Sequence, residues 1–278
     1  MEESLTAPAI VCGQDKGGWA MNRIFVSLCL AVVFGLGGCA LPNQQPVMIA
    51  PAGGDGHDPK LWKSISSADV VYIGEVHNNQ SNHEYELELV KSMLARHLRI
   101  AVGWEMFARS NQPLLDKFNR RQISLEQLLD QSGFKKSWGV YSPVYAKILA
   151  ATAANGVPNV GLNAEDRLVH RVAMDQTLNQ AEKNQIPTGY KVRPGAFENF
   201  VNLLGDHPGM TTADLRRYFA AQNIWDQTMA DSIVEFHRQN PETKVLVLAG
   251  RAHVQGGFGV PAYVPQKANL RQLVLLPK

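Results

Sequence analysis

The chain has 278 residues and a formal net charge of +2 at pH 7, from 27 Lys and Arg against 25 Asp and Glu. Because this charge is small and scattered along the sequence, composition does not favour a nucleic acid as partner. All three cysteines, Cys12, Cys29 and Cys39, lie near the start of the chain, so residues beyond them can form neither a disulfide framework nor a thiolate metal site.

The first predicted element is a secretory signal that begins at Met21. A short basic region there precedes an apolar run, 24–36, and small residues follow it, which is typical of a signal peptide. The run is shorter than the roughly 20 residues of a membrane-spanning helix. We interpret residues 1–20 as an upstream extension and 1–38 as the part removed; the alternative for the apolar run is a short buried helix.

The sequence Leu-Gly-Gly-Cys at 36–39 resembles a bacterial lipobox. This resemblance implies that Cys39 is acylated and anchors the protein in a bacterial membrane. The segment 39–60 is rich in Pro, Gly, Asn and Gln and is expected to be a flexible tether. The remaining residues, 61–278, are long enough for one domain with a buried core.

Three apolar runs within this domain are predicted to be buried strands, and each is followed by acid or imidazole side chains. The runs and their followers are 70–73 with Glu75 and His77, 100–104 with Glu105, and 245–249 with His253. Strands that alternate with helices predict a doubly wound parallel sheet. Ligands and catalytic groups collect at the carboxyl ends of such strands, so we expect these four side chains to lie in a single cleft.

Each of these groups also has an ordinary structural interpretation. His77 is either a ligand or acid–base group, or a residue whose ring caps the following helix. Glu75 lies two residues before it, so both face the same side of an extended segment, where the carboxylate orients His77 or His253. His83 lies on the first helix, either in the site or on its exposed face.

Glu105 follows Trp104 at the end of its strand. A carboxylate this close to a buried strand is costly unless it is paired. Its alternative to a role in the site is therefore a salt bridge to Arg251 or Arg109.

The helices are predicted from apolar spacing and from end signals. We expect them from Ser81, with a capping box to Glu84, and over 111–131, 144–154, 169–181 and 212–239, with a further strand over 157–162. The stretches 110–140 and 187–225 lack strand signals. They are predicted to be helical insertions that form a subdomain over the strand ends.

Several stretches of the chain resemble one family. They are 74–79 with His83, 104–107, 161–164, 221–230, 250–254 and 259–261. The chain is similar in these stretches to the ChaN-like haem-binding lipoproteins, within the wider Tiki and erythromycin-esterase superfamily. The helix 221–230 is the part that is specific to the ChaN branch.

The resemblance implies a three-layer α/β/α fold with a mostly parallel sheet and a smaller helical subdomain, and it implies binding of ferric haem. Tyr or His commonly holds the iron in uptake proteins, and the leading candidates are His207, Tyr141 and Tyr218, ahead of two further tyrosines, Tyr145 and Tyr190. At the strand ends, His77 and His253 are the other expected contacts. Arg251 departs from the family pattern, in which a small or amide residue is expected. Its positive charge beside His253 weakens the case for a tightly bound divalent metal there.

The long helix carries further candidates. Gln222 and Asp226 are four residues apart, so they share one face, and Asp226 faces either the core or the cleft. A neighbouring stripe that includes Met229 is expected to be core packing. Arg216 and Arg217 are suitable partners for haem propionates, although a solvated helix face explains them equally well.

Two functions follow as hypotheses. The first is a non-catalytic, lipid-anchored haem-binding protein of bacterial haem and iron uptake. It is placed in the outer membrane with its domain in the periplasm or at the cell surface, paired as a haem-dependent homodimer and served by an outer-membrane haem receptor.

The alternative, implied by the wider superfamily, is a metal-dependent or Glu/His-based hydrolase. There Glu75, His77, Glu105 and His253 act on water directly or through a divalent ion. The chain has neither an HExxH helix nor a serine nucleophile elbow that would fix this chemistry.

Overall fold

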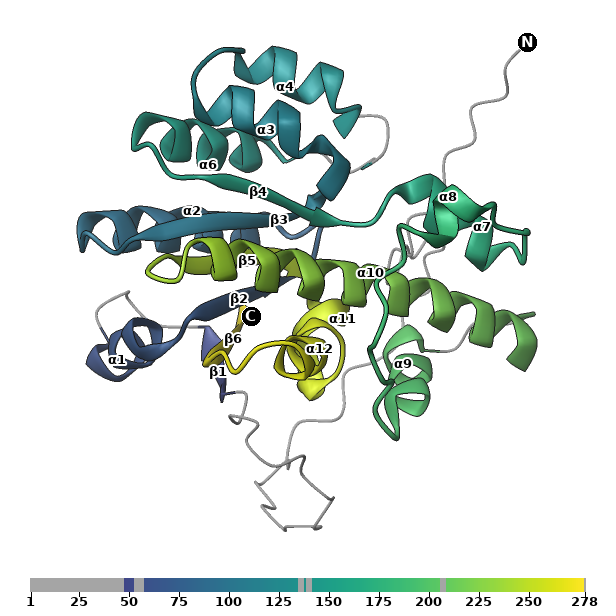
Figure 1. Ribbon diagram of the computed structural model, residues 1–278. Coiled ribbons are helices and arrows are strands. Elements are labelled where there is room, and N and C mark those ends of the chain that lie inside the picture. The colour runs from purple at the N-terminus through teal and green to yellow at the C-terminus, as the bar shows by residue number, and fades with distance from the viewer. Residues whose placement is uncertain (1–47, 53–57, 135–137, 139–141, 206–208, 278) are drawn as a thin grey trace, which may run out of the picture.

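A single parallel sheet organises the protein (Figure 1). The computed structural model describes residues 48–52, 58–134, 138, 142–205 and 209–277. The strands are β1 (Met48–Ala52), β2 (Val70–Glu75), β3 (Ile100–Ala108), β4 (Asn159–Asn163), β5 (Lys244–Gly250) and β6 (Gln272–Pro277). Their order is β1-β6-β2-β5-β3-β4, and all the pairs are parallel.

Helices cover both faces of this sheet (Figure 1). They are α1 (Pro59–Ser67), α2 (Gln80–Ala95), α3 (Gln112–Asn119), α4 (Leu125–Gln131), α6 (Pro143–Ala154), α7 (Asp166–Ala173), α8 (Gln180–Lys183), α9 (Ala196–Leu204), α10 (Thr212–Gln239), α11 (Arg251–Val254) and α12 (Val260–Tyr263). Short 3₁₀ turns, η1 (Arg109–Asn111), η2 (Gln255–Gly257) and η3 (Val264–Gln266), complete the connections.

The alternation of strand side chains creates two cores. Val71 and Ile73 face the helices α1, α2, α3, α4 and α6 in one core, whereas Val70 and Tyr72 face α10 and α12 in the other. Because successive residues of a strand point to opposite faces, both faces of a buried parallel strand are apolar. The three-layer α/β/α architecture that the sequence predicted is confirmed.

Helix boundaries differ from the prediction where local end signals compete. The first long helix, α2, begins at Gln80 because Asn79 caps it through the backbone N–H of Asn82, so the predicted start at Ser81 is wrong. The expected helix over 169–181 ends at Ala173, since Asp175 adopts a left-handed conformation with φ 54°. The long helix α10 has the bounds that the sequence predicted, 212–239.

Two further differences concern a segment expected to be one helix and a segment expected to be a tether. The region 111–131 forms two helices, because Arg121 has φ 57° and Ser124 caps a new start with a full capping box. Within the segment expected to be a tether, β1 pairs with β6 in the sheet. Among the described residues, no helix has the length and apolar character needed to cross a membrane.

Candidate functional site

The predicted acid and imidazole groups meet at the carboxyl ends of three neighbouring strands. In the sheet, β5 lies between β2 and β3, and Glu75 of β2 is in register with Gly250 of β5. Pairing of β3 with β5 reaches Trp104, so Glu105 is the next residue along that edge. The structure thus brings Glu75, Glu105 and the two histidines that follow β2 and β5 into one cluster.

His77 forms the exposed half of this cluster. Its Nδ1 lies 2.5 Å from Oε1 of Glu75, and its side chain remains 26% exposed whereas that of Glu75 is fully buried. The ring of Trp138 meets the imidazole edge to face, with 4.9 Å between ring centres. Since Asn79 caps α2, the alternative role of His77 as that cap is wrong. Glu75 instead fixes which way the ring of His77 points.

His253 forms the buried half, held between two carboxylates. Its Nε2 lies 3.2 Å from Glu105 Oε1, and its Nδ1 lies 2.6 Å from Asp226 Oδ1. The second oxygen of Glu105 accepts a hydrogen bond from the backbone N–H of Gly250 at 2.5 Å. Glu105 Oε1 is also 3.9 Å from His77 Nε2, so this carboxylate lies between the two imidazoles.

These contacts exclude the salt bridges considered for Glu105. Arg251 turns away and donates to the carbonyl of Pro277, so its charge is directed to the end of β6 rather than toward His253. Arg109 donates to Asp231 and to the carbonyl of Gln185.

The charges of the buried half follow from its geometry. Burial alone would lower the pKa of His253, but Glu105 and Asp226 outweigh it and raise the pKa to about 10. Burial would likewise raise the pKa of Glu105, but the neighbouring His253 holds it below its ordinary value. Burial dominates at Asp226 and raises its pKa even beside His253. At neutral pH the ring of His253 is therefore an imidazolium between carboxylates.

The exposed half is tuned in the same way. Burial opposes charge on His77, but its hydrogen bond to the Glu75 carboxylate and the charge of Glu105 raise its pKa above the ordinary value. Burial would raise the pKa of Glu75, but its hydrogen bonds with His77 and His83 lower it. His77 is thus a proton donor that reaches solvent, backed by an ionised carboxylate.

A second layer of polar groups, from α2 and α6, supports Glu75. Tyr145 donates its hydroxyl to Glu75 Oε1 at 2.6 Å, and His83 Nε2 lies 3.1 Å from Oε2. Only 2% of His83 is exposed, so its interpretation as an exposed helix residue is wrong. Glu86 is fully buried nearby, where burial and the charge of Glu75 raise its pKa well above the ordinary value.

The sequence missed Tyr145 and Glu86 as members of the cluster. Glu86 follows His83 by three residues and so shares its helix face, a signal that could have been used. Nothing local to Tyr145 indicates its contact with Glu75, which lies 70 residues earlier.

Two glycines provide the space that the cluster needs. A Cβ on Gly250 would lie 2.6 Å from Nε2 of His77, so only glycine lets this ring reach the end of β5. Gly259 has φ +69°, and a Cβ there would lie 2.2 Å from the carbonyl oxygen of His253. The glycine after the third strand run is therefore as much a part of the site as the histidine three residues later.

The long helix α10 contributes to both the core and the site. Met229 is fully buried in the core, which confirms the packing role expected for its stripe. Asp226 faces the cluster instead, and the side-chain amide of Gln222 lies 2.9 Å from the same Nδ1 of His253. The two residues share one imidazole, as their spacing of one helical turn allows.

The tyrosine and histidine candidates for iron are placed differently. Tyr141 and His207 lie outside the described residues. Tyr145 is committed to Glu75, and Tyr190 donates to Asp231 at 3.3 Å. Tyr218 packs half-buried against the α7 and α10 cluster, and its hydroxyl makes no hydrogen bond to any described residue.

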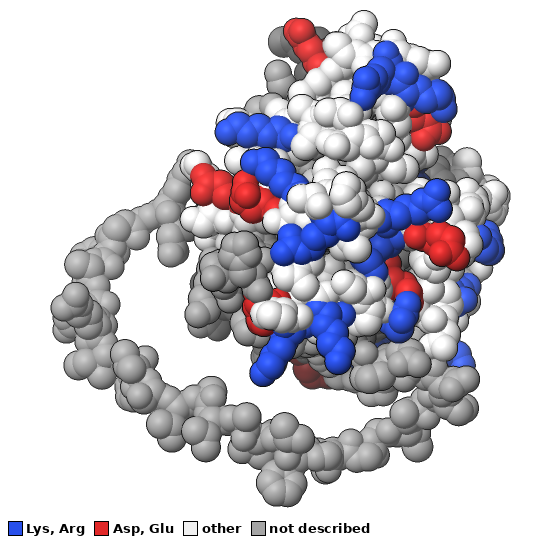
Figure 2. Space-filling model, turned by 90° about the vertical axis from the view of Figure 1, so that its left-hand side faces the viewer, with Lys and Arg blue, Asp and Glu red and all other residues white. Residues whose placement is uncertain are grey.

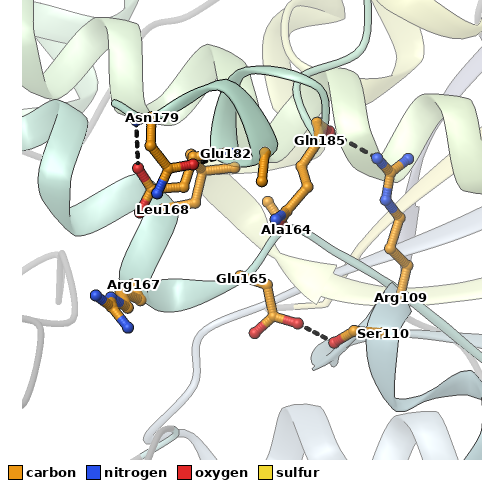
Figure 3. A pocket seen from close by; sticks show the side chains of 10 residues that line it. Arg109, Ser110, Ala164, Glu165, Arg167, Leu168, Asn179, Glu182 and Gln185 are labelled. Carbon is orange, nitrogen blue, oxygen red and sulfur yellow. Dashed lines mark hydrogen bonds between the residues drawn. The ribbon is translucent and has the colours of Figure 1, made fainter. Parts of the chain in front are cut away.

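A pocket of about 590 Å³ opens at the ends of β3 and β4, and no residue of the cluster lines it (Figure 3). Arg109 and Gln185 join across one side of it, and Ser110 and Glu165 are hydrogen-bonded at another. Most of its lining is charged or amide side chains.

The positions of the possible ligand side chains show whether they could hold a metal ion. Within the described parts of the chain, no group of three or more His, Cys, Asp and Glu side chains is placed to hold one. Both ring nitrogens of His253 already face carboxylates.

The fold and the cluster together define a parallel α/β domain with a buried carboxylate–imidazole site at its strand ends. Residues 61–264 match the model of a family described as haem-binding uptake, Tiki superfamily, ChaN. The chain belongs to this ChaN family, as the sequence resemblance indicated.

Solved structures resemble the domain at low sequence identity. A ChaN of Campylobacter jejuni, described by its cofacial heme binding, is 18% identical, covers 80% of this chain and 85% of its own, and has a TM-score of 0.60. A mutant of the erythromycin esterase EreC in its open conformation is 13% identical, covers 78% and 71%, and has a TM-score of 0.48. No curated protein sequence matches the chain.

Proposed function

We propose that this protein binds ferric haem on its helical part, next to the N-terminal half of α10. The observation that carries the proposal is the family match over 61–264, joined to an uncommitted phenol, Tyr218, in the same chain. An anionic phenolate suits ferric iron. Tyr141 and His207, which lie outside the described residues, remain the other two ligand candidates.

The surroundings of Tyr218 fit a flat apolar group. The neighbouring Phe219 packs with Phe197 and Phe200 in an aromatic cluster between α9 and α10. Arg216 is exposed and lies 4.8 Å from the ring centre of Phe197, so a cation is available there for a propionate. Arg217 is less available, because it donates to Asp214 and to the carbonyl of Ala173.

The strand-end histidines fit iron less well. His253 is buried, and both of its nitrogens are held by carboxylates, so it has no lone pair to offer. The Nδ1 of His77 is hydrogen-bonded to Glu75, so only Nε2 could bind iron, and Glu105 lies 3.9 Å from it. We therefore assign the iron to the helical part and not to the cluster.

The setting of this function is also proposed. The lipobox-like sequence at 36–39 supports acylation of Cys39, and hence an outer-membrane lipoprotein whose domain lies in the periplasm or at the cell surface. A role in haem uptake fits the description of the family, and we expect an outer-membrane haem receptor to serve it. A second copy of the chain would shield the open face of the haem, so we expect haem to promote a homodimer.

A hemin titration of the whole chain, followed by absorbance, tests the proposal. Saturable binding with a shifted Soret band is expected, with a high-spin spectrum if a phenolate holds the iron. Tyr218→Phe removes the phenol and keeps the ring, and Tyr190→Phe is the matched control. The proposal fails if hemin gives no saturable change.

A second candidate function, hydrolysis at the strand-end cluster, is favoured by one specific observation: the ionised Glu105 lies between two imidazoles. There the carboxylate would orient and deprotonate a water molecule, and His77 would supply a proton to the leaving group. In this proposal the Glu and His side chains carry out the proton transfers themselves. A panel of simple esters, assayed with wild type and Glu105→Gln, tests it; equal rates would rule it out.

A further inference from the structure

The end of the sheet opposite the cluster carries a concentration of basic side chains. Helices end and strands begin there: Arg96 follows α2, Arg99 precedes β3, Lys244 opens β5 and Arg271 precedes β6. Lys63 of α1, the helix that leads into β2, belongs to the same end. We call this surface the strand-start face.

Figure 2 views the molecule from this side, and Lys and Arg side chains spread across it with fewer Asp and Glu. One of the basic residues, Arg271, is neutralised by a close ion pair with Asp69. Lys63 and Arg99 are exposed and make no ion pair within the described residues. The strand-start face therefore has an excess of unpaired positive charge.

The chain also enters the domain at this face. Met48 of β1 is in register with Leu273, the second residue of β6, so β1 starts beside the strand-start face. Cys39 precedes Met48 by nine residues. At about 3.3–3.6 Å per residue, that length of chain reaches at most about 30 Å. A lipid on Cys39 would therefore hold the start of β1, and with it the strand-start face, within about 30 Å of the membrane.

We propose that the strand-start face docks on anionic phospholipid headgroups. The inference rests on the proposed acylation of Cys39. Basic clusters are attracted to anionic leaflets, and the attraction decays within a Debye length of about 8–10 Å. Strand β2 has 6 residues and so is about 20 Å long. Docking therefore turns the cluster and the haem-binding region toward the aqueous compartment.

Amide hydrogen exchange of the lipidated full chain, reconstituted in vesicles, measures the docked face. Vesicles of phosphatidylcholine alone are compared with vesicles that also contain phosphatidylglycerol. Around Arg96 and Arg99, exchange is expected to slow about threefold or more with phosphatidylglycerol and to recover at about 0.5 M NaCl. Equal exchange on both compositions, or protection at α7 and α8 instead, would overturn the proposal.

Charge reversal provides the matched comparison. The double variant Lys63→Glu with Arg99→Glu should lose the protection, whereas Lys183→Glu with Lys191→Glu, exposed residues in and after α8, should keep it. Protection that survives the first pair, or is lost in the second, contradicts docking through this face.

The anchor is tested separately, by the intact mass of the purified protein. The Cys39→Ser chain, which carries no lipid, should still sediment about tenfold more tightly with phosphatidylglycerol vesicles than with phosphatidylcholine vesicles at low salt. If the protein has the acyl mass but shows no preference for phosphatidylglycerol vesicles, the docking proposal is refuted and the anchor is not. The preference without an acyl mass refutes the anchor and leaves the basic surface established.

Discussion

The charge on His253 depends on two buried carboxylates, and Asp226→Asn removes one of them with little change in shape. The amide oxygen of the new side chain can still accept a hydrogen bond from Nδ1, so the ring stays in place. Only the negative charge is lost. The pKa of His253 should therefore fall, while Glu105 continues to hold the other ring nitrogen.

The size of the effect follows from the structure. The pKa of His253 is raised from 6.5 to about 10, which corresponds to about 5 kcal/mol at 1.36 kcal/mol per pH unit. Because burial lowers the pKa, the two carboxylates together supply more than this net rise. If they contribute equally, Asp226→Asn should lower the pKa by about 2 or more and reduce the electrostatic contribution by at least roughly 2 kcal/mol.

The upward direction of the pKa shift determines how the stability depends on pH. Because the folded pKa is above the unfolded one, the stabilisation from His253 is complete below pH 6.5 and is lost as the pH rises through about 10. Wild-type stability should therefore decline over this window, and the variant should decline less. Urea unfolding at both ends of the window measures this difference.

The pKa itself is read from the ring nitrogens by two-bond ¹H–¹⁵N NMR during a titration. The matched control is Asp231→Asn, on the same helix but paired with Arg109, which should leave the pKa of His253 unchanged. An unchanged or raised pKa in Asp226→Asn would refute the assignment of His253 as an imidazolium held by two carboxylates.

Three further predictions concern other parts of the molecule. Gly250→Ala places a methyl group against the ring of His77, so it should lower the free energy of unfolding by about 1–3 kcal/mol, measured by urea denaturation; unchanged stability would contradict the close approach. Tyr145→Phe removes a buried hydrogen bond to a carboxylate and should cost about 1.5–3 kcal/mol. Tyr85→Phe, whose hydroxyl has no partner in the described structure, should cost little, and equal losses in the two variants would argue against a special role for the first hydroxyl. Cys39→Ser should release the protein from membranes after a high-salt wash, and its retention there would count against acylation.

The parts of the site that follow from local pattern were predictable. Residues two apart in an extended segment share a side, and on this ground Glu75 and His77 were predicted to lie together. Parallel strands end at one edge, which brings Glu105 and His253 to the same place. The one-turn spacing of Gln222 and Asp226 likewise predicts a shared face.

The parts of the structure that depend on contacts between distant residues could not be predicted from the sequence. Tyr145 reaches Glu75 across 70 positions, and the sequence around it is that of an ordinary helix of small and apolar residues. The strand β1 lies in a segment rich in Pro and Gly, and its place in the sheet comes from pairing with β6 at the other end of the chain. The expected influence of Arg251 on Glu105 and His253 was wrong because tertiary packing sets the direction of a side chain. Here it turns Arg251 toward the carbonyl of Pro277.

The most direct test of the central claim, that haem iron is held by the helical part and not by the strand-end cluster, is hemin affinity measured side by side on two variants. One replaces all three ligand candidates, as Tyr141→Phe, His207→Ala and Tyr218→Phe; the other is Glu105→Gln. The triple variant should lose about tenfold or more in affinity and change its Soret spectrum, whereas Glu105→Gln should match wild type. An unchanged spectrum in the triple variant, together with lost binding in Glu105→Gln, would contradict the account.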